Sequence, residues 1–223
     1  MTEKTAAEDA FERFCVSKGI RWELISTEHA TGSKTPDYFI FPSGVKVATE
    51  LKEITPNDSE REQLRQFTEA GWSTFGGTVG ERVRNLIKKA GKQLRTKAKG
   101  CCPAIIVIYN PDCLLRRHTE PHEVKAAMYG FDTIVLGLSA DITEQPKLID
   151  RKSGRGRMLT DQHNTTVSAV AVLDGSGLTI YHNLFAAIPL TPAAFKGIAV
   201  GQFTLGSKRP CEFAEWVELK IES

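Results

Sequence analysis

The stretch Thr35-Pro36-Asp37-Tyr38-Phe39-Ile40-Phe41-Pro42-Ser43-Gly44-Val45-Lys46-Val47-Ala48-Thr49-Glu50-Leu51-Lys52 decides the predicted fold. Aromatic and β-branched residues on both sides favour strands, and Pro42-Ser43-Gly44 between them is a turn signal. We therefore predict a hairpin. If Ser43 and Gly44 form a two-residue loop, counting outward along both strands places Asp37 opposite Glu50.

This hairpin brings charged side chains together at its open end. Because side chains alternate along a strand, Glu50 and Lys52 share one face, and Asp37 joins them there. Two opposed carboxylates repel each other unless positive charge lies between them, and Mg²⁺ is often held by one or two carboxylates, water and substrate phosphate. Asp37 and Glu50 are therefore the expected metal ligands, with the Leu51 main-chain carbonyl within reach. Lys52 would orient the attacking water or stabilise the charge of the transition state.

The pattern Pro36-Asp37, a turn, then Glu50-Leu51-Lys52 resembles the signature of the PD-(D/E)XK nuclease superfamily, which has the restriction-endonuclease-like fold. The resemblance implies metal-dependent hydrolysis of phosphodiester bonds on a core ordered helix, three strands, helix, strand. It also implies a glutamate from the first helix beside the metal, for which Glu8 and Glu12 are candidates, although capping explains Glu8 more simply. The alternative is a surface hairpin with a salt bridge between Lys52 and a nearby carboxylate.

Composition indicates an ordinary globular protein. The chain has 223 residues, of which 41% are hydrophobic and 25% charged, which suits one domain. Its net charge of +2 means that any basic surface for nucleic acid must be local. The five cysteines form no CxxC pair and no zinc-binding spacing, and with no signal peptide in view they favour a cytoplasmic location. No apolar run approaches the length of a membrane span.

The flanking segments predict helices and strands on both sides of the hairpin. Thr5-x-x-Glu8 is a capping box that starts a helix over 6–18, and a strand follows over 20–25. After Lys52, Ser59-x-x-Glu62 starts a polar helix that reaches Ala70. Segment 104–109 is continuously apolar and predicts a buried central strand. Further on we expect a short helix over 121–129 and a strand over 133–138.

The helix after residue 78 carries separate apolar and basic stripes. Thr78-x-x-Glu81 caps it and Gly100 ends it. The apolar stripe consists of Val83, Ile87, Ala90, Leu94 and Ala98. The basic stripe consists of Arg84, Lys88, Lys92, Arg95 and Lys99. Such a line of cations can follow a phosphate backbone, although a charge run is more often a solvated face. By the resemblance, Lys89 and Gln93 on the adjacent flank are candidates for positions near the active site.

The C-terminal part carries weaker signals. Segment 150–157 is cationic and is interpreted as a loop, either folding onto nucleic acid or serving as a connection. Segments 166–173 and 178–182 predict a hairpin, and the tail from Ala187 predicts irregular structure ending in a strand over 216–221. His118 and its neighbours Glu120 and His122 are interpreted as a surface loop.

Taken together, the sequence predicts an α/β protein with a restriction-endonuclease-like three-layer core, in which helices flank a mixed central sheet, plus an extra C-terminal β-hairpin. We expect one domain, with a core over 5–140 and an elaboration over 141–223. The expected function is a Mg²⁺-dependent nuclease acting on DNA, for which Mn²⁺ can substitute. The alternatives are a nuclease acting on RNA, or a non-catalytic nucleic-acid-binding or protein-interaction domain with a vestigial site. We expect no membrane partner, and the resemblance raises a homodimer. The expected nucleic-acid-binding residues are Arg84, Lys88, Lys89, Lys92, Gln93 and Arg95.

Overall fold

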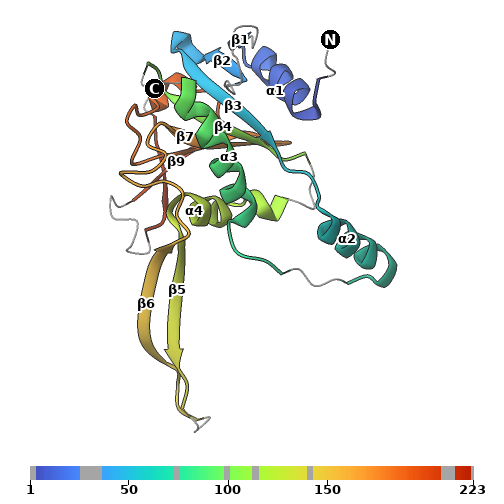
Figure 1. The fold of residues 1–223 in the computed structure, drawn as a ribbon, viewed down its shortest axis with the longest axis vertical. Helices are drawn as coiled ribbons and strands as arrows, with labels where there is room; N and C mark the ends of the chain where they lie inside the picture. Colours follow the sequence, from blue (N-terminus) through green and yellow to red (C-terminus); the bar gives the residue numbers. More distant parts are fainter. Residues whose placement is uncertain are drawn as a thin grey trace.

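The computed structural model describes residues 4–25, 37–72, 76–97, 101–111, 116–139, 143–206 and 214–221 (Figure 1). Pro36, Ala98, Lys99 and the predicted helix end at Gly100 lie outside these ranges. No helix among the described residues is long and apolar enough to cross a membrane.

A large mixed sheet forms the centre of the protein. In the described residues it has eight strands in the order β1-β2-β3-β4-β7-β8-β9-β10. The pairs β3–β4, β4–β7 and β8–β9 are parallel, and the other neighbours are antiparallel. The expected mixed α/β architecture is therefore confirmed. The strands are β1 Arg21–Leu24, β2 Tyr38–Phe41, β3 Val47–Glu53, β4 Ala104–Tyr109, β7 Ala169–Asp174, β8 Gly177–His182, β9 Gly201–Leu205 and β10 Trp216–Glu218.

Helices cover both faces of this sheet. Helix α1 (Ala6–Ser17) packs Phe11 and Cys15 into one apolar cluster, together with alternate residues of β2, β3 and β4. On the opposite face, α3 (Glu81–Lys97) lies over β3 and β4, and α4 (Pro121–Tyr129) packs against α3. The predicted apolar stripe of α3 is confirmed for Val83, Ile87, Ala90 and Leu94, which are fully buried. The sheet thus has a separate core on each face.

The β2–β3 hairpin has the predicted register. Tyr38 pairs with Thr49, and the turn is closed by a 2.9 Å hydrogen bond from the Val45 N–H to the Pro42 carbonyl. Ser43 and Gly44 both have positive φ, as a two-residue type I′ turn requires. A 3₁₀ turn, η1, spans Pro42–Gly44. Because the loop has two residues, the pairing is the one obtained by counting outward from it.

The sequence analysis predicted that the C-terminal hairpin is an addition to the core, and this prediction was wrong. Strand β7 pairs in parallel with β4, so the β7–β8 hairpin lies in the middle of the sheet. The tail also contains β9, a strand that the irregular-tail prediction missed. A parallel partner far away in the sequence leaves no local signal, because the pairing depends on which strand edge is available.

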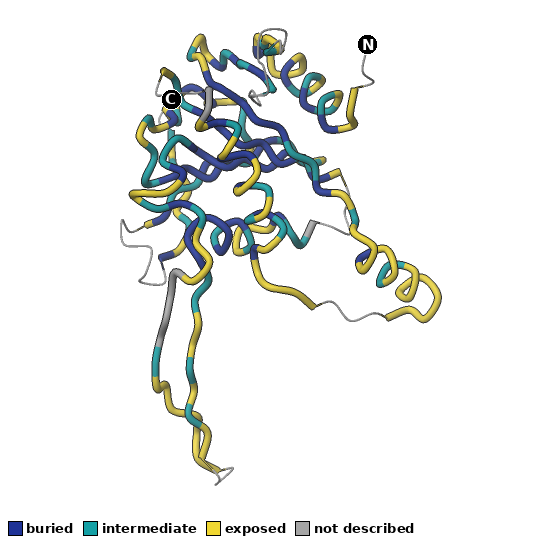
Figure 2. The backbone as a smooth tube through the Cα atoms, in the orientation of Figure 1, coloured by how far each residue is buried: buried dark blue, intermediate teal, exposed yellow. Residues whose placement is uncertain are grey.

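Two elements project from the body (Figures 1 and 2). The first is a two-stranded ribbon of β5 (Phe131–Gly137) and β6 (Lys147–Arg155). The prediction of a loop over 150–157 was therefore wrong for most of its length. The cationic residues there belong to a strand, whose pairing with β5 outweighs their low strand propensity. The second projecting element is helix α2 (Asp58–Ala70).

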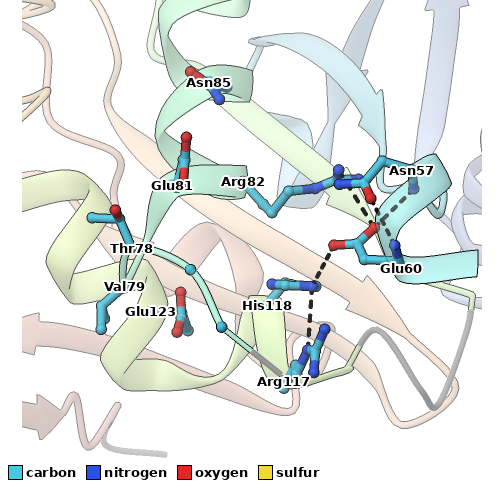
Figure 3. A pocket seen from close by; sticks show the side chains of 12 residues that line it. Asn57, Glu60, Thr78, Val79, Glu81, Arg82, Asn85, Arg117, His118 and Glu123 are labelled. Atoms are coloured by element: carbon cyan, nitrogen blue, oxygen red, sulfur yellow. Dashed lines mark hydrogen bonds and ion pairs between the residues drawn. The ribbon is translucent and has the colours of Figure 1, made fainter. Parts of the chain in front are cut away.

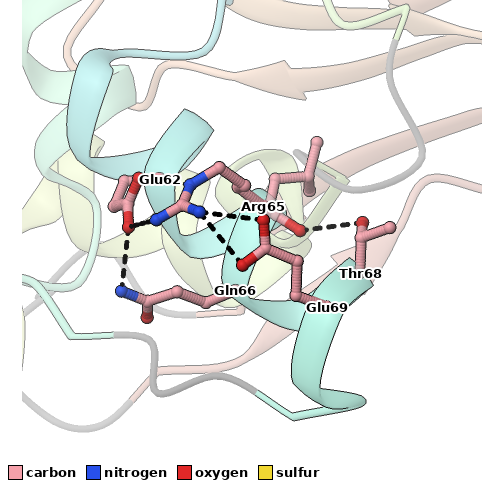
Figure 4. A network of polar contacts seen from close by, with 6 residues as sticks. Glu62, Arg65, Gln66, Thr68 and Glu69 are labelled. Carbon is pink, nitrogen blue, oxygen red and sulfur yellow. Dashed lines mark hydrogen bonds and ion pairs between the residues drawn. The ribbon is translucent and has the colours of Figure 1, made fainter.

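Helix α2 is exposed along nearly its whole length, and Glu60 is its buried residue. Its cap is Asn57, which forms a capping box with Glu60, so the predicted cap at Ser59 was two residues late. On the exposed side, Arg65 bridges Glu62 at 2.7 Å and Glu69 at 2.8 Å (Figure 4). Pairs spaced by three and four residues stabilise a helix that has little core to pack against. In contrast, the capping box of Thr5 and Glu8 on α1 is confirmed.

Two glycines provide a test of the packing at the start of α3. Gly80 and Gly71 have nearly the same positive φ, 73° and 74°. A Cβ at Gly80 would lie 2.6 Å from the Ala127 main-chain nitrogen of α4, whereas nothing lies within 4 Å of one at Gly71. We expect Gly71→Ala to cost about 1–2 kcal/mol of unfolding free energy from backbone strain alone.

Gly80→Ala should cost about 1–3 kcal/mol more than Gly71→Ala, because the α3–α4 contact must also open. Urea unfolding followed by circular dichroism measures both values. Equal losses in the two variants would contradict the described packing.

Candidate active site

Asp37 directly precedes β2, and Glu50 lies in β3, both near the open end of the β2–β3 hairpin. Tyr38 pairs with Thr49, but the Asp37 N–H also donates to the Thr49 carbonyl at 3.1 Å, so the regular pairing stops before Asp37. The Asp37 Oδ2 accepts a 2.7 Å hydrogen bond from the Leu51 N–H, so its carboxylate lies against the main chain beside Glu50. The Leu51 N–H thus connects Asp37 to the strand that carries Glu50, and the convergence of the Asp37 and Glu50 side chains stays a prediction.

Lys52 completes the group. Its Nζ forms an ion pair and hydrogen bond with the Glu50 Oε1. The Glu50 side chain is fully buried, whereas the Lys52 side chain is 20% exposed. Their neighbours on β4 are Ile106 and Ile108, which belong to the apolar cluster under α3. The site therefore lies on the α3 face, with its charged groups set into an apolar wall and Lys52 toward solvent.

The Leu51 main chain also faces this group. Its N–H donates to Asp37, and the N–H and C=O of one strand residue point to the same edge. The Leu51 carbonyl is therefore directed to the side of the strand where Asp37 lies.

Burial raises the pKa of the Asp37 carboxyl group above its ordinary value. The Leu51 N–H and the Lys52 ammonium oppose that rise, and the negative charge of Glu8 adds to it. A carboxylate held partly out of water beside a second acid is destabilised unless a cation compensates. The oxygen-rich donor set of Asp37, Glu50 and the Leu51 carbonyl fits a hard divalent ion.

The two glutamates of α1 already have other contacts. Glu8 closes the capping box with Thr5, as the simpler interpretation predicted. Glu12 accepts a hydrogen bond from the Tyr38 hydroxyl at 3.1 Å and forms a 2.6 Å ion pair with Lys4. Of the two, Glu8 is the one whose charge acts on Asp37. Among the described residues, no group of three or more His, Cys, Asp or Glu side chains could together hold a metal ion.

The predicted nucleic-acid-binding residues of α3 fall into two groups. Arg84 donates to the main-chain carbonyls of Gly156 at 2.7 Å and Val79 at 3.0 Å. Arg95 donates to the Asn164 side chain at 3.2 Å. These two arginines therefore tie α3 to neighbouring segments.

The lysines of α3 form the second group. Lys88, Lys89 and Lys92 are exposed and, with Asn85, line a hollow of about 370 Å³. Gln93 is half-buried on the same helix.

Sequence analysis missed a second polar cluster, at the carboxyl ends of β3 and β4 (Figure 3). His118 lies in the 3₁₀ turn η2 (Arg116–Thr119), and its Nε2 is 2.8 Å from the Glu60 Oε1. The prediction of a surface loop was wrong for His118, because its side chain is only 16% exposed. Burial lowers the pKa of the imidazole. The capping box at Asn57 was the one local signal that could have placed Glu60 at a helix start.

Comparison of the chain with protein-family models, curated proteins and solved structures gave no match.

The raised pKa of Asp37 predicts a stability effect. A group whose pKa is higher in the folded state stabilises it fully below the unfolded value, near 3.8 here, and that contribution is lost as the pH rises. At pH 7 and with chelator present, Asp37→Asn should therefore raise the midpoint of thermal unfolding, because the amide removes a buried charge and can still accept from Leu51.

The gain should vanish below about pH 4, where the carboxyl group is protonated in both states. Thermal unfolding of wild type and variant between pH 3 and pH 8 measures it. The exposed Asp161→Asn is the matched control and should show no such trend. A lower midpoint for Asp37→Asn at pH 7 would contradict the electrostatic description.

Proposed function

We propose that this protein is a Mg²⁺-dependent nuclease that hydrolyses phosphodiester bonds in DNA. The observation that carries the proposal is the group near the open end of the hairpin: Asp37 is held against the Leu51 main chain, and Glu50, the residue before Leu51, is paired with Lys52. A buried carboxylate paired with an ammonium, next to a second carboxylate held by the main chain, suits a metal and a phosphate better than a surface salt bridge.

The order of the elements supports the same proposal. Helix α1 is followed by the antiparallel strands β1, β2 and β3, and then by helices and the parallel strand β4. This sequence of elements resembles the restriction-endonuclease-like core, with α2 as an additional helix before α3. Because a fold can host many functions, the weight of the proposal rests on the site.

Each residue has a stated role in the proposal. Asp37 and Glu50 would supply carboxylate oxygens to the metal, and the Leu51 carbonyl would supply a third oxygen. A bound Mg²⁺ would polarise a phosphoryl oxygen and acidify a bound water. Lys52, positioned by Glu50, would orient that water or stabilise the developing negative charge. The apolar wall of Ile106 and Ile108 strengthens these interactions by excluding water.

The exposed lysines of α3 extend the proposal to substrate binding. Lys88, Lys89 and Lys92 gather on one helix, where several ammonium groups can contact phosphates along one strand. Arg84 and Arg95 are reassigned to holding α3 in place, since their guanidinium groups bind acceptors from 156 and 164.

Cleavage tests the proposed catalytic site. Single- and double-stranded DNA and RNA are incubated with Mg²⁺, Mn²⁺ or chelator, and products are followed on denaturing gels. We expect DNA cleavage that chelator abolishes, and Lys52→Ala should lower its rate at least about a hundredfold, the scale seen when a transition-state donor is removed.

The matched control is Lys46→Ala, which removes an exposed lysine from the same hairpin, where it lies over the Phe39 ring. It should cleave like the wild type. Cleavage of RNA but not of DNA would identify RNA as the substrate. Binding of nucleic acid without any metal-dependent cleavage would instead mark a binding module and defeat the enzymatic proposal.

Salt dependence tests the lysine surface. Each phosphate contact contributes about −0.9 to the slope of log K against log salt on duplex DNA. Lys88→Ala/Lys89→Ala should therefore weaken DNA binding and reduce the magnitude of that slope by up to about 1.8. Fluorescence anisotropy with a labelled duplex, in Ca²⁺ to prevent turnover, measures both quantities.

The control for this pair is Lys18→Ala, an exposed lysine that follows α1. An unchanged slope in the double variant, with affinity equal to that of Lys18→Ala, would remove α3 from the binding surface.

A further inference from the structure

A cavity of about 440 Å³ opens where β3 and β4 end. The segment after β3 contributes Asn57 and Glu60, and η2 after β4 contributes Arg117 and His118. The third wall is the start of α3 with the glycine-containing segment before it. In open α/β sheets, ligands bind outside the carboxyl ends of parallel strands. The cavity therefore occupies a position suited to a ligand, and it lies on the same sheet face as Lys52.

One wall of this cavity is an arrangement of donors around a carboxylate (Figure 3). The Glu60 Oε1 lies 2.8 Å from the His118 Nε2, and its Oε2 lies 3.5 Å from the Arg82 Nη1. The Oε2 also accepts the Asn57 N–H at 2.8 Å. An imidazole, a guanidinium and a main-chain N–H at a helix start are groups that also bind phosphate oxygens.

Arg82 also has a contact that does not involve Glu60, because it donates through its second terminal nitrogen to the Thr55 carbonyl. Arg117 lies beside His118, with 3.3 Å between its Nε and the imidazole Nε2. Arg82 would therefore keep one of its contacts if the Glu60 carboxylate moved away.

Glu60 itself is weakly anchored in the core. It is the buried residue of α2, whose remaining described side chains are intermediate or exposed. No apolar cluster includes α2, so moving this helix exposes little apolar surface. An anion that displaces the Glu60 carboxylate would therefore have to replace only the polar contacts of that carboxylate.

We propose that this wall is a phosphate-binding site and that the Glu60 carboxylate takes the place of the phosphate in its absence. Figure 3 places Glu81 near Thr78, and Glu123 between Val79 and His118. The Glu123 carboxylate accepts the Gly80 N–H at the start of α3, and its charge also acts on His118. The phosphate is thus directed to the side of Arg82, away from both of these acidic residues. Phosphate binding at this wall does not depend on the proposed nuclease activity, so it can be measured whether or not the protein cleaves nucleic acid.

Removal of the competing charge is the direct test. Inorganic phosphate is titrated into wild type and Glu60→Gln by isothermal calorimetry. We expect the variant to bind phosphate at least about tenfold more tightly than the wild type. The Glu60 carboxylate repels a phosphate bound beside it by more than about 1.4 kcal/mol at an intermediate dielectric constant, and this energy corresponds to about a tenfold change in affinity. Adding Arg82→Gln to Glu60→Gln should abolish the gain.

Glu62→Gln is the matched control, because it makes the same change two residues away, on the exposed side of α2. Its phosphate affinity should equal that of the wild type. Equal affinities of Glu60→Gln and Glu62→Gln would overturn the proposal, and so would a gain that survives Arg82→Gln.

Two further measurements complete the test. In the first, binding of an oligonucleotide with a 5′-phosphate to Glu60→Gln is compared with binding of the same oligonucleotide without that phosphate. Tighter binding of the phosphorylated oligonucleotide assigns the site to nucleic-acid ends. Equal binding of the two oligonucleotides assigns the site to free phosphate. If Glu60→Gln fails to fold, phosphate titration of the wild type followed by the His118 imidazole resonances replaces it. Saturable shifts support the site, and unmoved resonances reject it.

Discussion

The hydrogen bond from the Leu51 N–H to the Asp37 carboxylate is the contact on which the candidate active site depends. It joins the residue before β2 to β3 near the open end of the hairpin. Without it, the Asp37 side chain would be free to rotate into solvent. With it, one carboxylate is held beside the strand that carries Glu50 and Lys52, and burial raises its pKa.

The central strand β4 gives this hairpin its rigidity and its surroundings. It pairs in parallel with β3 on one side and β7 on the other, and its residues are buried on both faces. Because all three strands run in the same direction, their carboxyl ends meet at one edge. Both Lys52 and the cavity around His118 lie toward that edge on the α3 face.

Helix α2 is attached to the body by a different kind of contact from the other helices. The helices α1, α3 and α4 contribute apolar stripes to a core, whereas α2 is joined to the body through the Glu60 carboxylate and its capping box. Apolar packing is non-directional and costly to undo, but an ion pair can be exchanged for another of the same kind. The helix is therefore attached by a contact for which an anionic ligand can compete.

The sequence by itself determined the features set by near neighbours. The turn at Ser43 and Gly44 specified the register of the β2–β3 hairpin, and helical spacing identified the buried stripe of α3, because both depend on residues a few positions apart. Only the tertiary structure decided that β7 lies beside β4, that Arg84 and Arg95 bind acceptors from distant segments, and that Glu60 meets His118. Those contacts join segments that are far apart in the chain, and their partners are selected by which surfaces the packed sheet brings together.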